Sequence, residues 1–274
     1  MTRHHGDATE AALRIRQIVI EQSRRANVGH IGSCLSVADL LAVLYMRVLR
    51  HSPDASVERD RFILSKGHAA LALYGALHLA GYVSSAELDS FCEEGSRFGV
   101  HPDHSVTGID FSTGSLGHGL PMGVGAALGA RLQHSPRRSF VLVSDAECNE
   151  GSLWEAVMFA AHHQLSNLVA VVDDNGQQAL GKTTDVLDLS PLGRRWGAFG
   201  WDVHDVNGHD IDALTAAFQG LDTRQGPPHV VIAHTTFGKG VSFMEGLLKW
   251  HYWPMSADEF AQARRELERK GAQS

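Results

Sequence analysis

The sequence contains few cysteines and no long apolar run. Its 274 residues include only three cysteines, at positions 34, 92 and 148, and no two of them have a paired spacing. Because structural disulfides need paired cysteines in an oxidising compartment, this usage predicts reduced thiols and a cytoplasmic protein. No apolar run reaches the roughly 20 residues of a membrane-spanning helix, and the start, MTRHHGDATEA, lacks the apolar segment of a secretory signal. We therefore expect no contact with membranes.

Positive charge is scarce as well. The chain has 24 Lys and Arg residues against 31 Asp and Glu, a formal net charge of −7, and the two signs are interspersed. A nucleic-acid-binding surface needs a basic patch, so we expect no nucleic-acid partner. Apolar residues, in contrast, make up 43% of the chain, which is enough for one sizeable core. We therefore expect a single domain over residues 1–274.

Short apolar runs rich in β-branched residues alternate with helical patterns along the chain. Strands are expected at residues 61–65, 139–144, 168–172, 201–206 and 229–234. Helical patterns cover residues 10–26, 37–49, 84–91, 151–165, 192–199 and 210–221, and further helices end at Ala80, Leu132 and Lys270. The alternation predicts an α/β protein with a doubly wound, mainly parallel sheet and helices on both faces.

Three helix starts and one helix face have local signals. Ser36 is expected to cap the helix 37–49, Ser190-Pro191 to open the helix 192–199, and Ser256 to begin the last helix with a capping box. In the helix that ends at Leu132, glycines recur on one face at positions 123, 125 and 129. Such small residues indicate close packing against another helix.

The stretch 144–181 places an acid and an amide after two expected strands. Asp145 follows the strand 139–144, and Asn175 follows the strand 168–172. In a parallel sheet both residues reach the carboxyl edge, where open α/β sheets bind ligands. Carboxylate, amide and carbonyl oxygens suit Mg²⁺ or Ca²⁺ rather than zinc, and phosphate oxygens would complete the shell. The alternative interpretation is an Asp and an Asn in ordinary turns.

Four histidines stand in loops that are far apart in the sequence: His30, His68, His101 and His251. They meet only if these loops share one edge of the sheet. Imidazoles there could bind hydroxyl and carbonyl oxygens of a ligand and pass protons near neutral pH. No two of the four have the short helical spacing of a zinc site, so a zinc hydrolase is a distant alternative. Each histidine alone is more typical of an ordinary loop.

A glycine-rich loop, Thr113–Gly119, opens the helix that ends at Leu132. Such loops cradle phosphates at helix N-termini. This one lacks the Lys of a P-loop and the preceding strand of a dinucleotide site, which argues against nucleotide binding.

Taken together, these motifs resemble the transketolase family over about residues 10–260. The family signature for thiamine diphosphate opens with an Asp, continues with Glu-Gly and closes with Asp-Asn. The matching segments here are Asp145, Glu150-Gly151, Trp154-Glu155-Ala156, Asp174-Asn175, Gly29-His30, Gly67-His68, His101-Pro102 and Thr113–Gly119. Two departures are Ala146 and Tyr252, where the family has glycine. Ala146 adds a methyl group near the expected diphosphate.

The resemblance implies a role for each matching residue. A Mg²⁺ or Ca²⁺ ion would be held by Asp145, Asn175 and the carbonyl oxygen of Gln177. Residues expected to border thiamine diphosphate are His68, Gly114, Ser115, Leu116, Ala146, Glu150, Asn175 and His251. The catalytic histidines expected to face the sugar are His30, His101 and His251. Glu150 and Glu155 would lie near a subunit contact, or would be solvated charges in the first turn of a helix.

The implied reaction is transfer of a two-carbon ketol unit from a ketose to an aldose, commonly with sugar phosphates as substrates. The pyrimidine ring of the cofactor needs a second domain, and after Ser256 the sequence holds only one helix. We therefore predict a split enzyme. Its C-terminal transketolase subunit would carry the pyrimidine domain, in a heterotetramer of two chains of each kind. The alternatives are the α subunit of a 2-oxo-acid dehydrogenase and a non-catalytic interaction protein that retains the fold.

Overall fold

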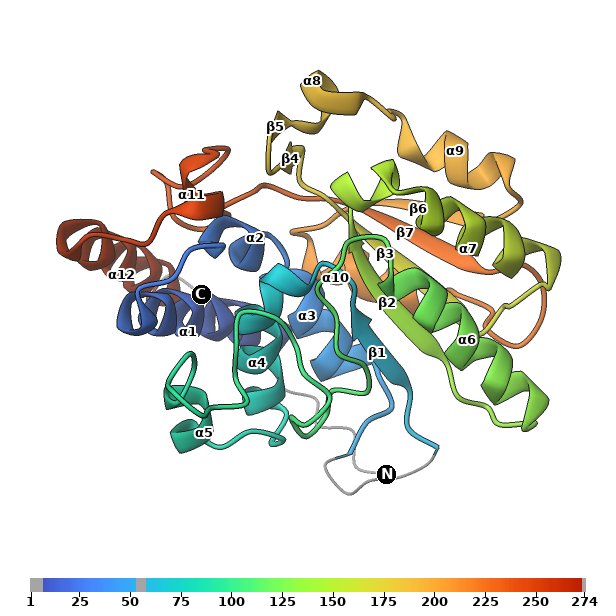
Figure 1. Ribbon diagram of the computed structural model, residues 1–274, viewed down its shortest axis with the longest axis horizontal. Coiled ribbons are helices and arrows are strands. Elements are labelled where there is room, and N and C mark those ends of the chain that lie inside the picture. The colour runs from blue at the N-terminus through green and yellow to red at the C-terminus, as the bar shows by residue number, and fades with distance from the viewer. Residues whose placement is uncertain (1–6, 53–57, 273–274) are drawn as a thin grey trace.

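The computed structural model describes residues 7–52 and 58–272, and it confirms the predicted α/β architecture. One sheet contains β1 (Arg61–Leu64), β2 (Ser139–Ser144), β3 (Leu168–Asp174), β7 (His229–His234) and β6 (Asp202–Asn207), in that order. All neighbouring strands in it are parallel. A separate antiparallel hairpin joins β4 (Gln177–Gln178) to β5 (Gly181–Lys182). Figure 1 shows the sheet running through the molecule between helices.

Helices cover both faces of the sheet. One face packs against α1 (Ala8–Ala26), α3 (Ala38–Val43), α4 (Ala70–Leu79) and α10 (Ile211–Gln219). The other packs against α6 (Gly119–Leu132), α7 (Gly151–His162) and α9 (Leu192–Ala198). Within β2, Phe140 and Leu142 point into the first core and Val141 and Val143 into the second. This alternation follows from the two-residue period of a strand and explains why the central strands are apolar throughout.

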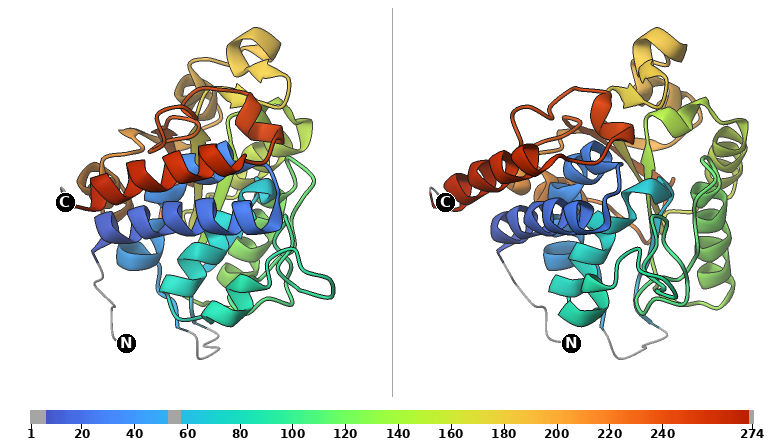
Figure 2. Two further views of the ribbon diagram at one scale, coloured as in Figure 1. Left: turned by 90° about the vertical axis from the view of Figure 1, so that its left-hand side faces the viewer. Right: turned by 60° about the vertical axis from the view of Figure 1, so that its left-hand side comes forward.

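The remaining elements complete the layers. The last helix, α12 (Ala257–Gly271), lies along α1, as Figure 2 shows. It begins with the predicted capping box of Ser256 and Glu259, and a second capping box starts α5 (Ser85–Asp89). The hairpin β4–β5 and two short helices, α8 (Thr183–Leu187) and α11 (Lys249–Tyr252), had no signal in the sequence. None of the helices in the described part of the chain is long and apolar enough to cross a membrane.

Two predicted capping arrangements are wrong, although α9 does begin at Leu192 as expected. Ser36 does not cap a helix over 37–49, because it is the last residue of α2 (Ile31–Ser36), and α3 ends at Val43 before a π-helical turn. Gly32 lies inside α2 despite its low helix propensity, since a methyl group there would be 2.1 Å from the Phe237 ring. Pro191 is the N-cap of α9 rather than its first-turn residue, and the Ser190–Pro191 peptide bond is cis.

The glycines of α6 have unequal surroundings. A methyl group at Gly123 would lie 2.3 Å from Cγ2 of Val141 in β2, whereas Gly125 and Gly129 have open space. At Gly123 the close neighbour is therefore the sheet and not another helix.

This contrast gives a stability test within one helix. Gly123→Ala is expected to lower the free energy of unfolding by about 1–2 kcal/mol, because overpacking against rigid Val141 exceeds the gain in helix propensity. Gly125→Ala, the matched control, is expected to raise it by up to about 1 kcal/mol. Urea unfolding of the purified chain measures both changes. Equal shifts in the two variants would contradict the close contact between α6 and β2.

Candidate active site

The carboxyl ends of four strands bring the predicted site residues to one edge of the sheet. Lys66 and His68 follow β1, Asp145 follows β2, and Asn175 follows β3. β7 ends beside β3 and is followed by Thr235. Because the strands are parallel, side chains that are distant in sequence meet at this edge.

A fully buried ion pair lies at the centre of the edge. Nζ of Lys66 contacts Oδ2 of Asp173, and both side chains are 0% exposed. The same oxygen accepts hydrogen bonds from Ser36 Oγ and Asn175 Nδ2, each at 2.8 Å, and Oδ1 accepts one from Thr235 Oγ1 at 2.5 Å. A buried carboxylate is tolerated only when it is paired and hydrogen-bonded in this way. The network fixes α2 and the ends of β1, β3 and β7 relative to one another.

Asp145 and Asn175 face the same loop. Asp145 Oδ2 accepts the backbone N–H of Gly176 at 2.8 Å, and its Oδ1 accepts that of Ala146 at 2.8 Å. Asn175 Oδ1 accepts the N–H of Gln177 at 2.9 Å, while its amide nitrogen donates to Asp173. Because the Asp173 carboxylate can only accept hydrogen bonds, the Asn175 atom that faces it is the amide nitrogen, and the other is the oxygen. The Asp145 carboxylate and the Asn175 amide oxygen therefore each accept a hydrogen bond from the backbone of residues 176–177.

The buried carboxylates around Asp145 favour a bound cation. Burial, together with nearby Asp173 and Asp174, raises the pKa of Asp145 to about 7, although Lys66 opposes the shift. Among the described residues, Asp145 has no ion-pair partner of its own, and its carboxylate contacts the N–H groups of Ala146 and Gly176, while Asn175 Oδ1 lies on the same loop. This donor set fits a hard divalent ion, which would take few protein ligands and leave room for phosphate oxygens.

Three of the four predicted histidines form a cluster. The ring centroids of His30 and His68 lie 5.5 Å apart, those of His30 and His251 5.2 Å, and those of His68 and His251 5.5 Å. Ser33 Oγ lies 2.8 Å from His68 Nε2. The Nδ1 atoms of His30 and His251 are buried without a hydrogen-bond partner among the described residues. Unpartnered buried nitrogens of this kind are available to a bound polar ligand.

The cluster is held in the neutral state. Burial lowers the pKa of His30, with a further effect of His101, and lowers that of His251 to about 4. The pKa of His68 falls well below its usual range because of burial and the nearby charge of Lys66. Neutral imidazoles can each donate one hydrogen bond and accept another, which suits the hydroxyl groups of a sugar.

The glycine-rich loop passes close to the cluster and is anchored on both sides. Thr113 Oγ1 donates to the Leu64 carbonyl at 2.6 Å, and Gly119 N donates to Ser65 Oγ at 3.0 Å. A methyl group at Gly119 would lie only 2.3 Å from Ser65 Cβ, so the approach requires glycine. The segment between these anchors, Gly114–Leu116, is exposed at the site edge.

His101 lies beside this loop. A methyl group at Gly114 would be 3.6 Å from the His101 ring, and the His101 carbonyl accepts a hydrogen bond of 3.0 Å from Tyr74 Oη. His101 is exposed, and its charge affects the pKa of both His30 and His68. All four predicted histidines are therefore in one neighbourhood.

Sequence reasoning missed two buried acids at the edge, Asp173 and Glu147. Glu147 is 0% exposed, and its Oε1 accepts hydrogen bonds from Ser65 Oγ at 2.5 Å and Gly117 N at 2.9 Å. Its Oε2 accepts Ser144 N at 2.9 Å. Glu147 thus ties the ends of β1 and β2 to the glycine-rich loop. Lys66 was missed as well, although its place directly after a buried strand, beside His68, was a usable signal.

The two departures from the family pattern are accommodated. Ala146 begins a 3₁₀ turn (Ala146–Asn149) with an ordinary right-handed backbone, so the position does not require glycine. Tyr252 Oη donates to the Ala179 carbonyl at 2.5 Å and links α11 to the β4–β5 hairpin. Its ring lies 4.9 Å from that of His251.

The two expected interface acids are exposed. Glu150 is the N-cap of α7, and Glu155 lies one turn further along the same helix. Gly117 fits directly against Glu150, since a methyl group there would be 2.6 Å from Glu150 Cβ. Glu150 therefore borders the glycine-rich loop.

Comparison with known proteins identifies relatives of this arrangement. A family described as the thiamine diphosphate binding domain of transketolase matches residues 8–274. The chain is 42% identical to an apulose-4-phosphate transketolase subunit of Phocaeicola vulgatus, over 92% of this chain and 90% of that protein. It is 39% identical to the 6-deoxy-6-sulfo-D-fructose transketolase subunit SqwG of a Clostridium species, over 99% and 100% of the two chains.

Solved structures share the fold. The transketolase of Campylobacter jejuni superimposes with a TM-score of 0.89 at 30% identity, over 95% of this chain and 42% of that one. This chain thus spans about two fifths of the solved enzyme but nearly the whole of the proteins named as subunits. The matches favour transketolase over the 2-oxo-acid dehydrogenase alternative. The chain belongs to the transketolase family, as an N-terminal, thiamine diphosphate-binding subunit of the split type.

Proposed function

We propose that this chain forms the diphosphate-binding half of a two-chain transketolase that moves a two-carbon ketol unit from a ketose to an aldose. The observation that carries the proposal is the meeting of two groups at one sheet edge. Asp145 and the 175–177 loop supply oxygen donors near the buried Lys66, whose charge also affects the pKa of His68 and His251 in the neutral histidine cluster.

The oxygen donors are proposed to hold the metal and the diphosphate. Asp145, Asn175 and the Gln177 carbonyl would bind Mg²⁺, whose remaining positions the diphosphate would fill. Gly114, Ser115, Leu116, Ala146, Glu150, His68 and His251 would border the cofactor. When bound, thiamine diphosphate supplies the nucleophilic carbon for ketol transfer. The protein's part is to orient the reactants and exclude water.

His30, His101 and His251 are proposed to act on the sugar. In His30 and His251 the buried Nδ1 atom has no hydrogen-bond partner among the described residues. Each of these nitrogens can therefore bind a sugar hydroxyl group. Because burial keeps their pKa values low, both are free bases at neutral pH and can accept a proton from a hydroxyl group. His101 stands at the exposed mouth of the cluster.

A partner polypeptide is proposed to carry the pyrimidine domain. The two bacterial relatives described above, which match this chain in length, are named as transketolase subunits. Large apolar side chains are exposed in the segments around the site: Leu116, Leu180, Val186, Leu187, Leu247, Tyr252 and Trp253. Figure 1 shows the hairpin β4–β5, α8 and α11, which contribute several of them, near one another at the top of the view. Exposed apolar groups of this kind indicate a binding surface.

The proposal extends to the assembly of the enzyme and to the class of its ketose substrate. We propose a single domain over residues 1–274 and two chains of each kind, with Glu150 and Glu155 near a subunit contact. Both named relatives act on a ketose with a terminal anionic group, a phosphate in one and a sulfonate in the other. We propose a ketose of that class as the donor here.

Reconstitution tests the two-chain proposal. The chain alone is expected to be inactive with a ketose, an aldose, thiamine diphosphate and Mg²⁺. Activity should appear when a subunit that carries the pyrimidine domain is added. Trp253→Ala should weaken subunit binding by roughly tenfold or more, because a buried Trp often dominates an interface. Leu132→Ala, at an equally exposed apolar site on the far end of α6, is the control.

Subunit binding is measured by titration and activity by product formation. Full activity of the isolated chain would contradict the proposal. A stable pair that binds no thiamine diphosphate would instead favour a non-catalytic interaction protein.

The histidine roles have a separate test in the reconstituted pair. His30→Asn is expected to reduce kcat/KM for the ketose by about 10²-fold or more while leaving thiamine diphosphate affinity unchanged. His162→Ala, on the outer part of α7, is the control. Because the pKa values of His30 and His251 lie below the ordinary 6.5, wild-type activity should stay level as the pH falls from neutral to about 6.5. Steady-state kinetics measure both effects, and an equal loss of cofactor affinity in His30→Asn would refute the assignment.

A further inference from the structure

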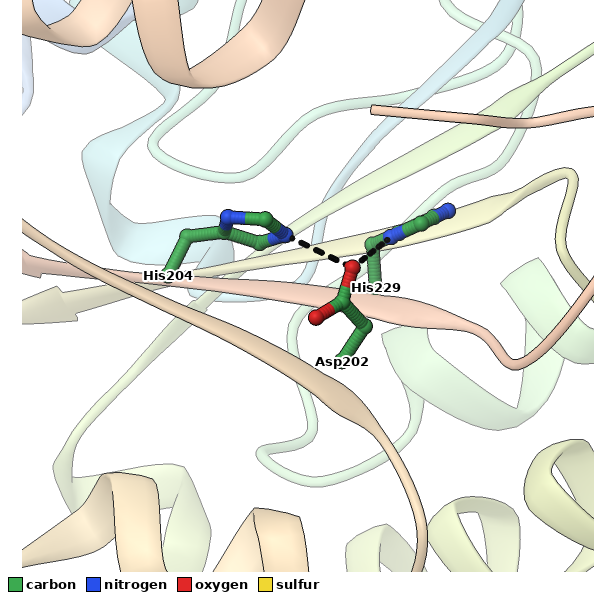
Figure 3. A group of neighbouring side chains, drawn as sticks. All are labelled: Asp202, His204 and His229. Carbon is green, nitrogen blue, oxygen red and sulfur yellow. Dashed lines mark hydrogen bonds and ion pairs between the residues drawn. The ribbon is translucent and has the colours of Figure 1, made fainter. Parts of the chain in front are cut away.

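A second group of ligand-type side chains lies at the opposite end of the sheet. Asp202 is the first residue of β6 and pairs in register with His229, the first residue of β7. His204 is two residues further along β6, and its side chain therefore lies on the same face of the strand as Asp202. Figure 3 shows both imidazole rings directed at one carboxylate oxygen of Asp202.

The three ligand atoms are close enough to share one ion. Asp202 Oδ2 lies 3.1 Å from His204 Nε2 and 3.1 Å from His229 Nδ1, and all three atoms lie within 4.8 Å of one another. A tetrahedral zinc ion with bonds of about 2.1 Å holds its ligand atoms roughly 3.4 Å apart. Only small side-chain movements therefore separate the observed positions from a metal-bound geometry.

The hydrogen bond on the far side of His229 decides which nitrogen carries its proton. His229 Nε2 lies 3.0 Å from the carbonyl oxygen of Asp222, which can only accept a hydrogen bond. The proton of the neutral ring is therefore on Nε2, and the lone pair of Nδ1 points at the Asp202 carboxylate. Two acceptors face each other at 3.1 Å, and they need a cation between them or an added proton on the ring.

This arrangement is the usual one for a metal-binding histidine. Metal-binding histidines commonly donate their second N–H to a backbone carbonyl, which fixes the tautomer and aims the other nitrogen at the ion. The His229 side chain is 4% exposed and rigidly held, whereas those of Asp202 and His204 are 48% and 29% exposed. The buried His229 thus fixes the orientation of the site, and the side of Asp202 and His204 is open to solvent, which gives an ion a path of entry.

We propose that Asp202, His204 and His229 form a zinc site with three protein ligands and an open fourth position. Two imidazole nitrogens and one carboxylate oxygen suit zinc rather than the Mg²⁺ proposed at the cofactor edge. The two sites are distinct, because five residue steps along β7 separate its two ends by roughly 16 Å. The zinc ion connects the edge strand β6 to the neighbouring strand β7 and stabilises that edge.

Zinc binding by the full chain tests the proposal. After chelator treatment, and with excess Mg²⁺ to occupy hard-cation sites, the wild-type chain is titrated with Zn²⁺ alone against a competing dye. One equivalent is expected to bind, and Asp202→Asn and His204→Ala should each weaken its binding by about tenfold or more, since loss of outer-shell contacts alone costs that much. Zn²⁺ should also raise the Tm of the wild type and not of these variants.

His162→Ala is the matched control, because it removes an exposed histidine from α7 and should leave zinc affinity and the Tm shift unchanged. Circular dichroism confirms folding, and the two variants change exposed side chains while the buried His229 stays in place. Co²⁺ in place of Zn²⁺ should give the visible spectrum of a low-coordinate ion in the wild type alone. Equal zinc affinity in the wild type, Asp202→Asn and His204→Ala, or no saturable binding by the wild type, would overturn the site and leave a protonated His229 paired with Asp202.

Discussion

The carboxyl edge of the sheet buries more negative charge than positive. Asp145 and Asp173 are both buried there, while Lys66, the one buried lysine among the described residues, pairs with Asp173. In such surroundings an unpaired carboxylate is costly, and the pKa of Asp145 rises to about 7 as a result. A divalent cation beside Asn175 would reverse this cost. This edge therefore favours binding of an added positive charge, such as a divalent cation. The proposed function depends on this excess of buried carboxylates.

At the same edge, the backbone of the glycine-rich loop packs directly against the ends of the strands. The glycine-rich loop reaches the ends of β1 and β2 because Gly119 fits against Ser65 and Gly117 donates to the buried Glu147. The exposed part of the loop then lies beside His101. Burial also lowers the pKa values of the histidines, and the charge of Lys66 adds to this effect at His68 and His251.

The fold was predictable because strands that are buried on both faces have a strong local signal, and the spacing of the acid and the amide was enough to place them at one edge. Burial and long-range contacts were not predictable. Glu147 looks like a turn residue in the sequence, and Asp173 looks like the end of a strand, until their buried partners are seen. The helix around Gly32 was missed because its contact with Phe237, over two hundred positions away, outweighs propensity. The histidine–aspartate group at the other end depends on the register of β6 and β7, which no local pattern encodes.

The most direct test of the account is the Mg²⁺-dependent affinity of the reconstituted pair for thiamine diphosphate, measured by calorimetry for the wild type, Asp145→Asn and Asp205→Asn. Each variant removes one carboxylate charge, but only Asp145 faces the 175–177 loop, since Asp205 is exposed on β6 and pairs with His234. The account predicts a loss of about 10²-fold for Asp145→Asn, the scale of one lost charged ligand, and little change for Asp205→Asn. Equal affinities in all three proteins would contradict it.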